Sequence, residues 1–334
     1  MQRTKPSLID RILKSESAII MGIGGGGDVI QGIPIANLMR QLGVKKVFMG
    51  GVSCQWWTPD GNPLANEWGS AVMGPTVYPV SDLQEAELVA PHVALVNENS
   101  NYNGKRPCEA RLASLIPAEE VFVAGLSGGV IGLARSLNQL IADERIDLFV
   151  GVDIGSDSFH DGKEASPAKT SLVDFISLGA ITRLECPTIY GVSGYGCDGE
   201  MQLEELDERV SRVMKAGGYL GAHGLTQQDV LEMERASEAY PDPIEPMSYR
   251  AARGEFGFRN VWTNGPYGTV VKVTPLASVM MLFDPDVLGE VCSTGIADLV
   301  QTESLEEAEE IYREKLGQFP ESRMHHVIDF FRTK

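Results

Sequence analysis

The chain has 334 residues, of which 43% are hydrophobic and 22% are charged, close to the averages of globular proteins. This composition excludes disordered, collagen-like and coiled-coil proteins, and the length allows one large domain or two. The formal net charge of −18 disfavours nucleic acid and anionic membrane surfaces as partners. No apolar run reaches the ~18 residues of a membrane span, and the N-terminus lacks the apolar region of a signal peptide, so we expect a cytoplasmic protein.

The first half of the sequence alternates short apolar runs with helical patterns, which predicts an α/β fold. The expected elements, in chain order, begin with a helix over 6–14, a strand over 17–22, a helix over 30–43 and a strand over 45–52. Three strand-to-turn units follow over 92–104, 121–129 and 146–164, with helices over 130–144 and 166–180 after the last two units. An apolar run over 186–194 then precedes a helix over 201–218. Buried parallel strands are typically almost purely apolar, as these are. The sequence therefore predicts a Rossmann-like, mostly parallel sheet flanked by helices.

The segment 53–81 interrupts this alternation and holds three of the four tryptophans among proline, glycine and asparagine. It is typical of a long ordered loop over the sheet, and such loops are often functional. Its tryptophans either stack on a ligand or cover the sheet edge or a contact between copies of the chain. A homo-oligomer that uses this loop or the C-terminal portion is therefore one expectation.

The pattern changes after Gly217. A capping box at Thr226 and Asp229 predicts the start of a helix that reaches about residue 240. Strands are predicted over 256–262 and 269–274, with a third over 279–284, and helices over 304–317 and 321–331. We expect an α/β ligand-binding domain over 1–217 and a smaller α+β portion over 218–334 packed on it, or one continuous domain.

The strongest local signal is the glycine run over 22–29, which lies between a predicted strand and a predicted helix and fits G-x-G-x-x-G. Such a loop lets backbone N–H groups approach a phosphate, so the cofactor-binding candidates here are Gly24, Gly25, Gly26 and Gly27. The acidic residue that would bind a dinucleotide ribose is absent from the end of the second strand. Tight packing of helix on strand is the alternative role, and Asp28 is either a helix N-cap or a catalytic carboxylate.

A second glycine turn contains Ser127, Gly128 and Gly129, again between a strand and a helix. These residues are suited to hold a phosphate or hydroxyl beside the first loop, and they join the cofactor-binding candidates. Arg253 is a further candidate, because a guanidinium in an acidic protein matches phosphate or carboxylate. Surface ion pairing is the alternative for this arginine.

Acidic residues crowd after the apolar strand of the unit over 146–164. Several carboxylates at one strand end repel one another unless a divalent cation, a bound base or protonation relieves them. We therefore expect Mg²⁺ at Asp153, Asp157 and Asp198, the last after the next apolar run, and His160 as a second catalytic candidate. An Asx-turn or a helix cap is the structural alternative for the aspartates.

The turns after these strands face one crevice, because the carboxyl ends of parallel strands share one edge of the sheet. Taken together, the motifs resemble a family of unknown function found in archaea and some bacteria, domain of unknown function 1152. The resemblance rests on GGGGDV, LSGGVIGLA, GVDIGSD, GCDGE and RGEFGFRN, which span about residues 22–285. It implies a shared architecture and a shared site, and it implies no activity.

Our first hypothesis is a metal-assisted transferase or hydrolase that acts on a small phosphorylated or nucleoside-like metabolite, a nucleotide included. A non-catalytic metabolite- or nucleotide-binding protein is the alternative, because we identify no nucleophile–base pair of the GxSxG or Cys/His kind. A nicotinamide-dependent oxidoreductase is a third hypothesis, which the missing ribose-binding acid disfavours.

Overall fold

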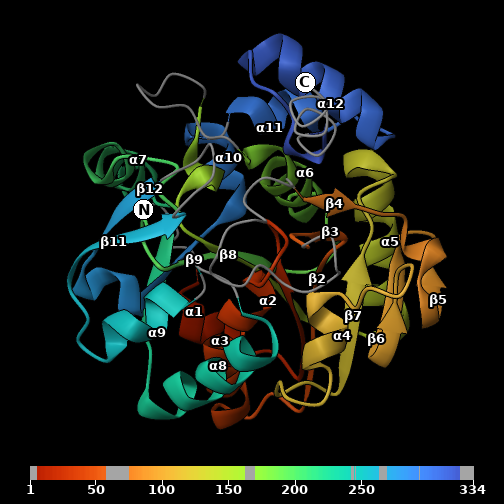
Figure 1. The fold of residues 1–334 in the computed structure, drawn as a ribbon, viewed down its shortest axis with the longest axis horizontal. Helices are drawn as coiled ribbons and strands as arrows, with labels where there is room; N and C mark the ends of the chain where they lie inside the picture. Colours follow the sequence, from red (N-terminus) through yellow and green to blue (C-terminus); the bar gives the residue numbers. More distant parts are fainter. Residues whose placement is uncertain are drawn as a thin grey trace.

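The computed structural model describes residues 6–57, 75–161, 170–241, 244, 246–262, 269–292 and 294–323. Its centre is a nine-stranded sheet with the strand order β10-β13-β9-β8-β1-β2-β7-β6-β5 (Figure 1). The five inner strands pair in parallel: β1 (Ser17–Gly22), β2 (Lys46–Val52), β7 (Glu120–Ala124), β8 (Leu148–Ile154) and β9 (Thr188–Ser193). Antiparallel pairing adds two strands at each side: β10 (Tyr219–Gly224) with β13 (Val279–Phe283), and β5 (Gln84–Ala90) with β6 (Val93–Asn101).

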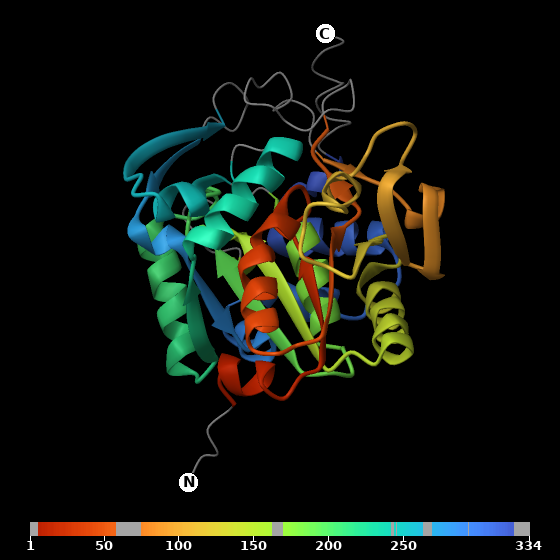
Figure 2. The ribbon, with the colours of Figure 1, turned by 90° about the horizontal axis from the view of Figure 1, so that it is seen from below.

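Helices cover both faces of this sheet, and each face has its own apolar core. One core includes side chains of α1 (Leu8–Ile12), α2 (Asp28–Gln31), α3 (Ile33–Gln41), α4 (Cys108–Leu112) and α8 (Gln227–Ala239). The other includes α5 (Gly129–Glu144), α6 (Ser171–Ile181), α7 (Leu203–Lys215), α10 (Pro285–Val291), α11 (Thr294–Leu299) and α12 (Leu305–Leu316). Figure 2 shows strands between the two helical layers. These findings confirm the predicted α/β fold.

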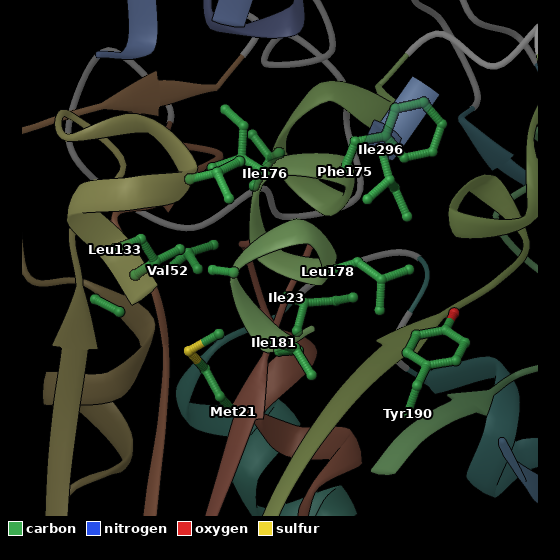
Figure 3. Packing of buried hydrophobic residues seen from close by; sticks show 14 of the residues in the cluster. Met21, Ile23, Val52, Leu133, Phe175, Ile176, Leu178, Ile181, Tyr190 and Ile296 are labelled. Carbon is green, nitrogen blue, oxygen red and sulfur yellow. The ribbon is translucent and has the colours of Figure 1, made fainter. Parts of the chain in front are cut away.

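Helix α6 is buried along its whole length, because the sheet lies on one side of it and α11 and α12 lie on the other. Figure 3 shows Ile181 of α6 next to Ile23, which follows β1, and Phe175 beside Ile296 of α11. Each large apolar side chain buried in this way contributes about 1.5–3 kcal/mol relative to an exposed one. The position of α6 over the sheet is therefore firmly set, and so is that of any polar residue it carries.

The predicted orientation of one strand was wrong. The apolar run over 92–104 was expected to be a parallel unit with its carboxyl end at the common edge, but β6 pairs antiparallel with both β5 and β7. Strands β5 and β10 were not predicted, because their burial is uneven and their sequences show no continuous apolar run. The run over 279–284 forms β13 in the central sheet instead of a third strand beside β11 and β12.

Residues after 217 contribute to the same sheet as residues before it, since β13 lies between β9 and β10. They also form a separate hairpin, β11 (Gly257–Trp262) with β12 (Thr269–Val273), which packs with α9 (Pro246–Ala252) in a small third core. The remaining elements are the short pair β3 (Cys54–Gln55) and β4 (Thr76–Val77) and the 3₁₀ turns over Val80–Asp82, Asp157–Phe159, Pro275–Ser278 and Glu321–Arg323.

Several predicted helices have different bounds. The helix expected over 30–43 is interrupted at Gly32, where α2 ends and α3 begins, and a methyl group at this position would lie 2.7 Å from Cγ2 of Ile20. The expected helix over 321–331 is a 3₁₀ turn in its described part, and residues 324–334 lie outside the described ranges. Among the described residues, every helix is too short or too polar to cross a lipid bilayer.

Candidate functional site

The chain changes direction along the sheet at the boundary between β1 and β8. From β1 it continues to β2 and β7 on one side, whereas β8 and β9 lie on the other side of β1. In an open parallel sheet, the loops at such a boundary diverge and leave the crevice in which ligands bind. The glycine loop after β1 and the acidic loop after β8 flank this position.

Three buried aspartates converge there. Asp153 is near the end of β8, Asp157 opens the following 3₁₀ turn, and Asp174 lies in the first turn of α6. Each offers a carboxylate oxygen, and these three oxygens lie within 4.8 Å of one another. We refer to Asp153, Asp157 and Asp174 as the aspartate cluster.

Hydroxyl groups hold the aspartate cluster in place. Ser158 Oγ donates to Asp153 Oδ2 at 2.7 Å and lies 3.3 Å from Asp174 Oδ1. Tyr190 on β9 donates to the same oxygen of Asp153 at 3.1 Å. Because Ser158, Tyr190 and Asp153 are all buried, these bonds fix the carboxylate of Asp153 while leaving no solvent to screen its charge.

The electrostatics of the aspartate cluster are strongly unfavourable for three negative charges. Burial raises the pKa of all three carboxyl groups, and the charges of neighbouring carboxylates raise the pKa of Asp157 and Asp174 further. Within the described part of the chain, none of the three forms an ion pair with Lys or Arg. Protons or a divalent cation must therefore offset the charge.

The glycine loop after β1 lies directly against these acids. A methyl group on Gly24 would lie 2.9 Å from Asp28 Oδ2 and 3.0 Å from Asp174 Oδ1. The N–H of Gly24 donates to Asp28 Oδ2 at 2.6 Å, and the N–H of Gly26 donates to the carbonyl of Cys54 at 2.8 Å. Two of the expected phosphate-binding amides are thus engaged within the protein, and a phosphate at this loop would face two carboxylates.

The structure also defines the roles of the other residues in this loop. Gly25 and Gly26 have φ values of +93° and +58°, a region that favours glycine, and Gly25 approaches the carbonyl of Cys54 closely. The N-cap position of α2 is occupied by Gly27, so the cap alternative for Asp28 is wrong. The carboxylate of Asp28 instead bonds back to Gly24 beside Asp174.

Asp198, predicted as the third metal ligand, lies beside the aspartate cluster and not within it. Its carboxylate accepts bonds from the N–H and the hydroxyl of Ser156, both at 2.9 Å. Burial, followed by the charge of Glu200, raises its pKa to about 7. The third member of the cluster is Asp174, which the sequence analysis missed; the signal was a single acid inside the apolar helical run SLVDFISLGA.

His160 and Asp161 follow the aspartate cluster but face away to other partners. His160 is buried, and its Nε2 atom lies 3.2 Å from the carbonyl oxygen of Glu200. Asp161 forms a two-pronged ion pair with Arg209, with N···O distances of 2.7 and 3.0 Å. These contacts explain the burial of both side chains, and the catalytic role of His160 stays a prediction.

The second glycine turn is engaged by the C-terminal part of the chain. The N–H groups of Val130 and Ile131, in the first turn of α5, donate to the hydroxyl and the carbonyl of Thr302 at 3.2 and 3.0 Å. A methyl group on Gly129 would lie 2.7 Å from the same carbonyl. These amides are therefore already paired, and the side chain of Ser127 contacts His92, with 3.2 Å between Oγ and Nδ1.

Arg253 and Trp57 each contact other side chains of the protein. Arg253 is exposed at the end of α9, and its Nε atom lies 2.5 Å from Glu234 Oε1, so it forms a surface ion pair. Trp57 is buried and stacks on Tyr78 and Tyr102, with ring centroids 5.6 and 6.3 Å away. Residues 58–74, with the rest of the tryptophan loop, and 162–169 lie outside the described residues.

Fold and site together define an α/β protein with buried acidic side chains at the boundary between β1 and β8 of a mostly parallel sheet. Comparison with protein families then places it: the chain belongs to the family described as protein of unknown function DUF1152, whose model matches residues 19–323. This confirms the expected family, and the match runs through residue 217 into the C-terminal portion. Neither the curated proteins nor the solved structures contained a match.

Proposed function

We propose that this protein is a divalent-cation-dependent transferase or hydrolase acting on a small phosphorylated or nucleoside-like metabolite. The observation that carries the proposal is the aspartate cluster at the boundary between β1 and β8, with its carboxylate oxygens within 4.8 Å of one another. Mg²⁺ prefers oxygen ligands and is usually held by a few carboxylates together with substrate phosphates. Asp153, Asp157 and Asp174 offer that donor set.

The charge of the site predicts the order of binding. A phosphate next to Asp28 and Asp174 is repelled unless a cation lies between them, since both acids border the glycine loop. A bound Mg²⁺ supplies the positive charge that offsets the substrate phosphate and the charge that develops during transfer. Phosphorylated metabolites should accordingly bind only when the cation is present.

The residues of the chain have separate roles in this proposal. Ser158 and Tyr190 orient Asp153 through their hydroxyl groups. Gly24 orients Asp28 through its N–H, so that the carboxylate borders the aspartate cluster without belonging to it. Asp28 is therefore the group that we expect to move a proton, because it is close to the reacting position and separate from the proposed ligands.

A cation titration tests the first step. Mg²⁺ or Mn²⁺ added to chelator-treated protein should raise the thermal unfolding temperature, by the linkage between ligand binding and folding. Asp174→Asn should remove this increase. Glu109→Gln is a matched control, because Glu109 is also a buried acid but accepts a hydrogen bond from Gln55 of the separate β3–β4 pair and is not a member of the aspartate cluster. Absence of any cation effect on wild-type protein would contradict the proposal.

A metabolite screen tests the second step. Nucleotides, nucleosides and sugar phosphates are added with and without the cation, binding is read by thermal shift, and products are read by mass spectrometry. Cation-dependent binding with turnover supports an enzyme. Cation-dependent binding without turnover supports the alternative, a metabolite-binding protein, and binding of phosphates without a cation contradicts the proposed order.

A further inference from the structure

The turn between β7 and α5 contains a sequence that the sequence analysis overlooked. Residues 125–129 read Gly-Leu-Ser-Gly-Gly, which fits G-x-S-x-G with Ser127 at the centre. This pattern, placed between a strand and a helix, presents a serine hydroxyl at the carboxyl edge of a sheet. Ser127 is exposed at that edge, and the helix that follows has 16 residues.

The antiparallel direction of β6 brings a base to this serine. Val93 at the start of β6 pairs with Ala124 at the end of β7, and the N–H of Gly125 donates to the carbonyl of His92 at 2.7 Å. His92 therefore lies beside Ser127 although 35 positions separate them in sequence. The distance between Ser127 Oγ and His92 Nδ1 is 3.2 Å, within the range of a nucleophile and its base.

Two glycines of the α5 turn make room for the imidazole ring. A methyl group on Gly132 would lie 2.9 Å from His92 Nε2, and one on Gly128 would be closer still. The backbone N–H of His92 donates to Ser136 Oγ at 3.1 Å, which ties the residue to the same helix. The ring thus packs with Nε2 against α5 and Nδ1 next to the hydroxyl of Ser127.

The imidazole of His92 is favoured in its neutral form. Partial burial, followed by the positive charge of Arg135, lowers the pKa of His92. The neutral ring is therefore favoured at neutral pH, and in the tautomer with its proton on Nε2 the Nδ1 atom can accept the hydroxyl proton of Ser127.

We infer that Ser127 and His92 form a nucleophile–base pair that hydrolyses carboxylic esters reached from the solvent. Ser127 Oγ forms a bond to the ester carbonyl carbon as its proton passes to His92 Nδ1. The carbon–oxygen bond to the leaving alcohol then breaks, and the alcohol takes this proton. Water attacks the acyl-serine, gives one proton to Nδ1 and releases the acid, and the proton returns to Ser127.

The surroundings of the pair point to esters instead of amides. No acidic side chain among the described residues contacts Nε2, which faces glycines, so the ring lacks the carboxylate that stabilises the imidazolium in a triad. An activated ester needs less assistance, because its leaving group departs readily. The N–H of Gly128, the residue after the serine, has no acceptor in the described part of the chain, and in this sequence pattern the corresponding N–H is the donor to the ester carbonyl oxygen.

This pair is independent of the aspartate cluster. Ser127 follows β7, whereas Asp153 of the aspartate cluster lies on β8, and β2 and β1 lie between these two strands, so the strand ends are about 14 Å apart along the edge at a strand spacing of ~4.8 Å. Failure of cation binding would leave the inference intact, and failure of serine labelling would leave the proposed function intact.

A fluorophosphonate probe tests the nucleophile on the full chain. We expect the probe to label Ser127, identified by peptide mass spectrometry, and the protein to hydrolyse p-nitrophenyl acetate. Ser127→Ala should abolish both, whereas Ser81→Ala, which removes another exposed serine hydroxyl, should change neither. No labelling of folded wild-type protein, or labelling elsewhere, would overturn the inference.

Two measurements test the base. His92→Gln should slow labelling by about 100-fold, the usual contribution of a general base, and an unchanged rate in folded protein would contradict the pairing. If this variant does not fold, Ser127→Cys supplies the answer. Its thiol should react with iodoacetamide about 10-fold faster than glutathione at the same pH because a neighbouring base favours the thiolate; equal rates would exclude activation by His92.

Discussion

The glycine turns after β1 and after β7 are similar in sequence and very different in surroundings. Both join a buried strand to a helix, yet the first borders Asp28 and Asp174, whereas the second borders His92 and Thr302. The first environment is buried and anionic, and the second is exposed and holds a neutral pair. A glycine turn therefore fixes the backbone path, and the residues that arrive from distant segments decide what the turn can bind.

The largest expected effect concerns the packing of the first turn. Gly25→Ala should destabilise the protein by about 3 kcal/mol or more, because it combines a positive φ with a methyl group 2.5 Å from the carbonyl oxygen of Cys54. Gly43→Ala is the matched control: its φ is +97° with nothing within 4 Å, so we expect about 1–2 kcal/mol. Chemical denaturation measures both, and equal losses would show that the turn is not tightly packed.

The pH dependence of stability tests the burial of Glu109 against β2, the strand that lies between the two turns. Glu109 contacts the end of β2 at Gly51, and burial raises its pKa to about 8. The folded state then keeps a proton that the unfolded state releases above its ordinary pKa of 4.5, so stability should fall as pH rises, by up to about 3 kcal/mol between pH 6 and pH 8. Glu109→Gln should remove this part of the slope in denaturation curves; an unchanged slope would place its origin elsewhere.

The effect of Asp174→Asn on stability should change sign when the cation is added. Without a cation, the amide relieves like-charge repulsion and should stabilise the protein by about 1 kcal/mol. With the cation at a hundredfold excess over its dissociation constant, wild-type protein gains about 2.7 kcal/mol and the variant gains little. Calorimetric unfolding with and without Mg²⁺ measures both, and a variant less stable than wild type in chelator would contradict the electrostatic account.

The smallest effect concerns the cap of the second turn. Thr302→Val keeps the shape of the side chain and removes the hydroxyl that pairs with the N–H of Val130, so we expect a loss of about 1 kcal/mol. Cation binding should be unchanged, because Thr302 touches α5 and not the aspartate cluster. A loss of the cation effect in this variant would mean that the two turns are coupled.

Local sequence patterns predicted the strands β1, β2, β7, β8 and β9, the capped helix α8 and the family, since each depends on neighbours in the chain. Two residues show what such patterns miss. Asp174 was missed because only the return of α6 over the sheet brings it to Asp153. His92 was missed because the sequence of β6 is compatible with either strand direction, and the antiparallel pairing with β7 decides which end reaches the turn.

The position of β13 between β9 and β10 has a consequence for biosynthesis. The sheet cannot be completed beyond β9 until Phe283 has emerged from the ribosome, because β13 pairs with β9. The nascent chain therefore has an unpaired edge at β9 while the preceding residues fold. A fragment that ends at residue 217 keeps this edge and loses the helices that cover α6. Such a fragment should aggregate during expression, whereas the chain through residue 323 includes every described partner of the sheet.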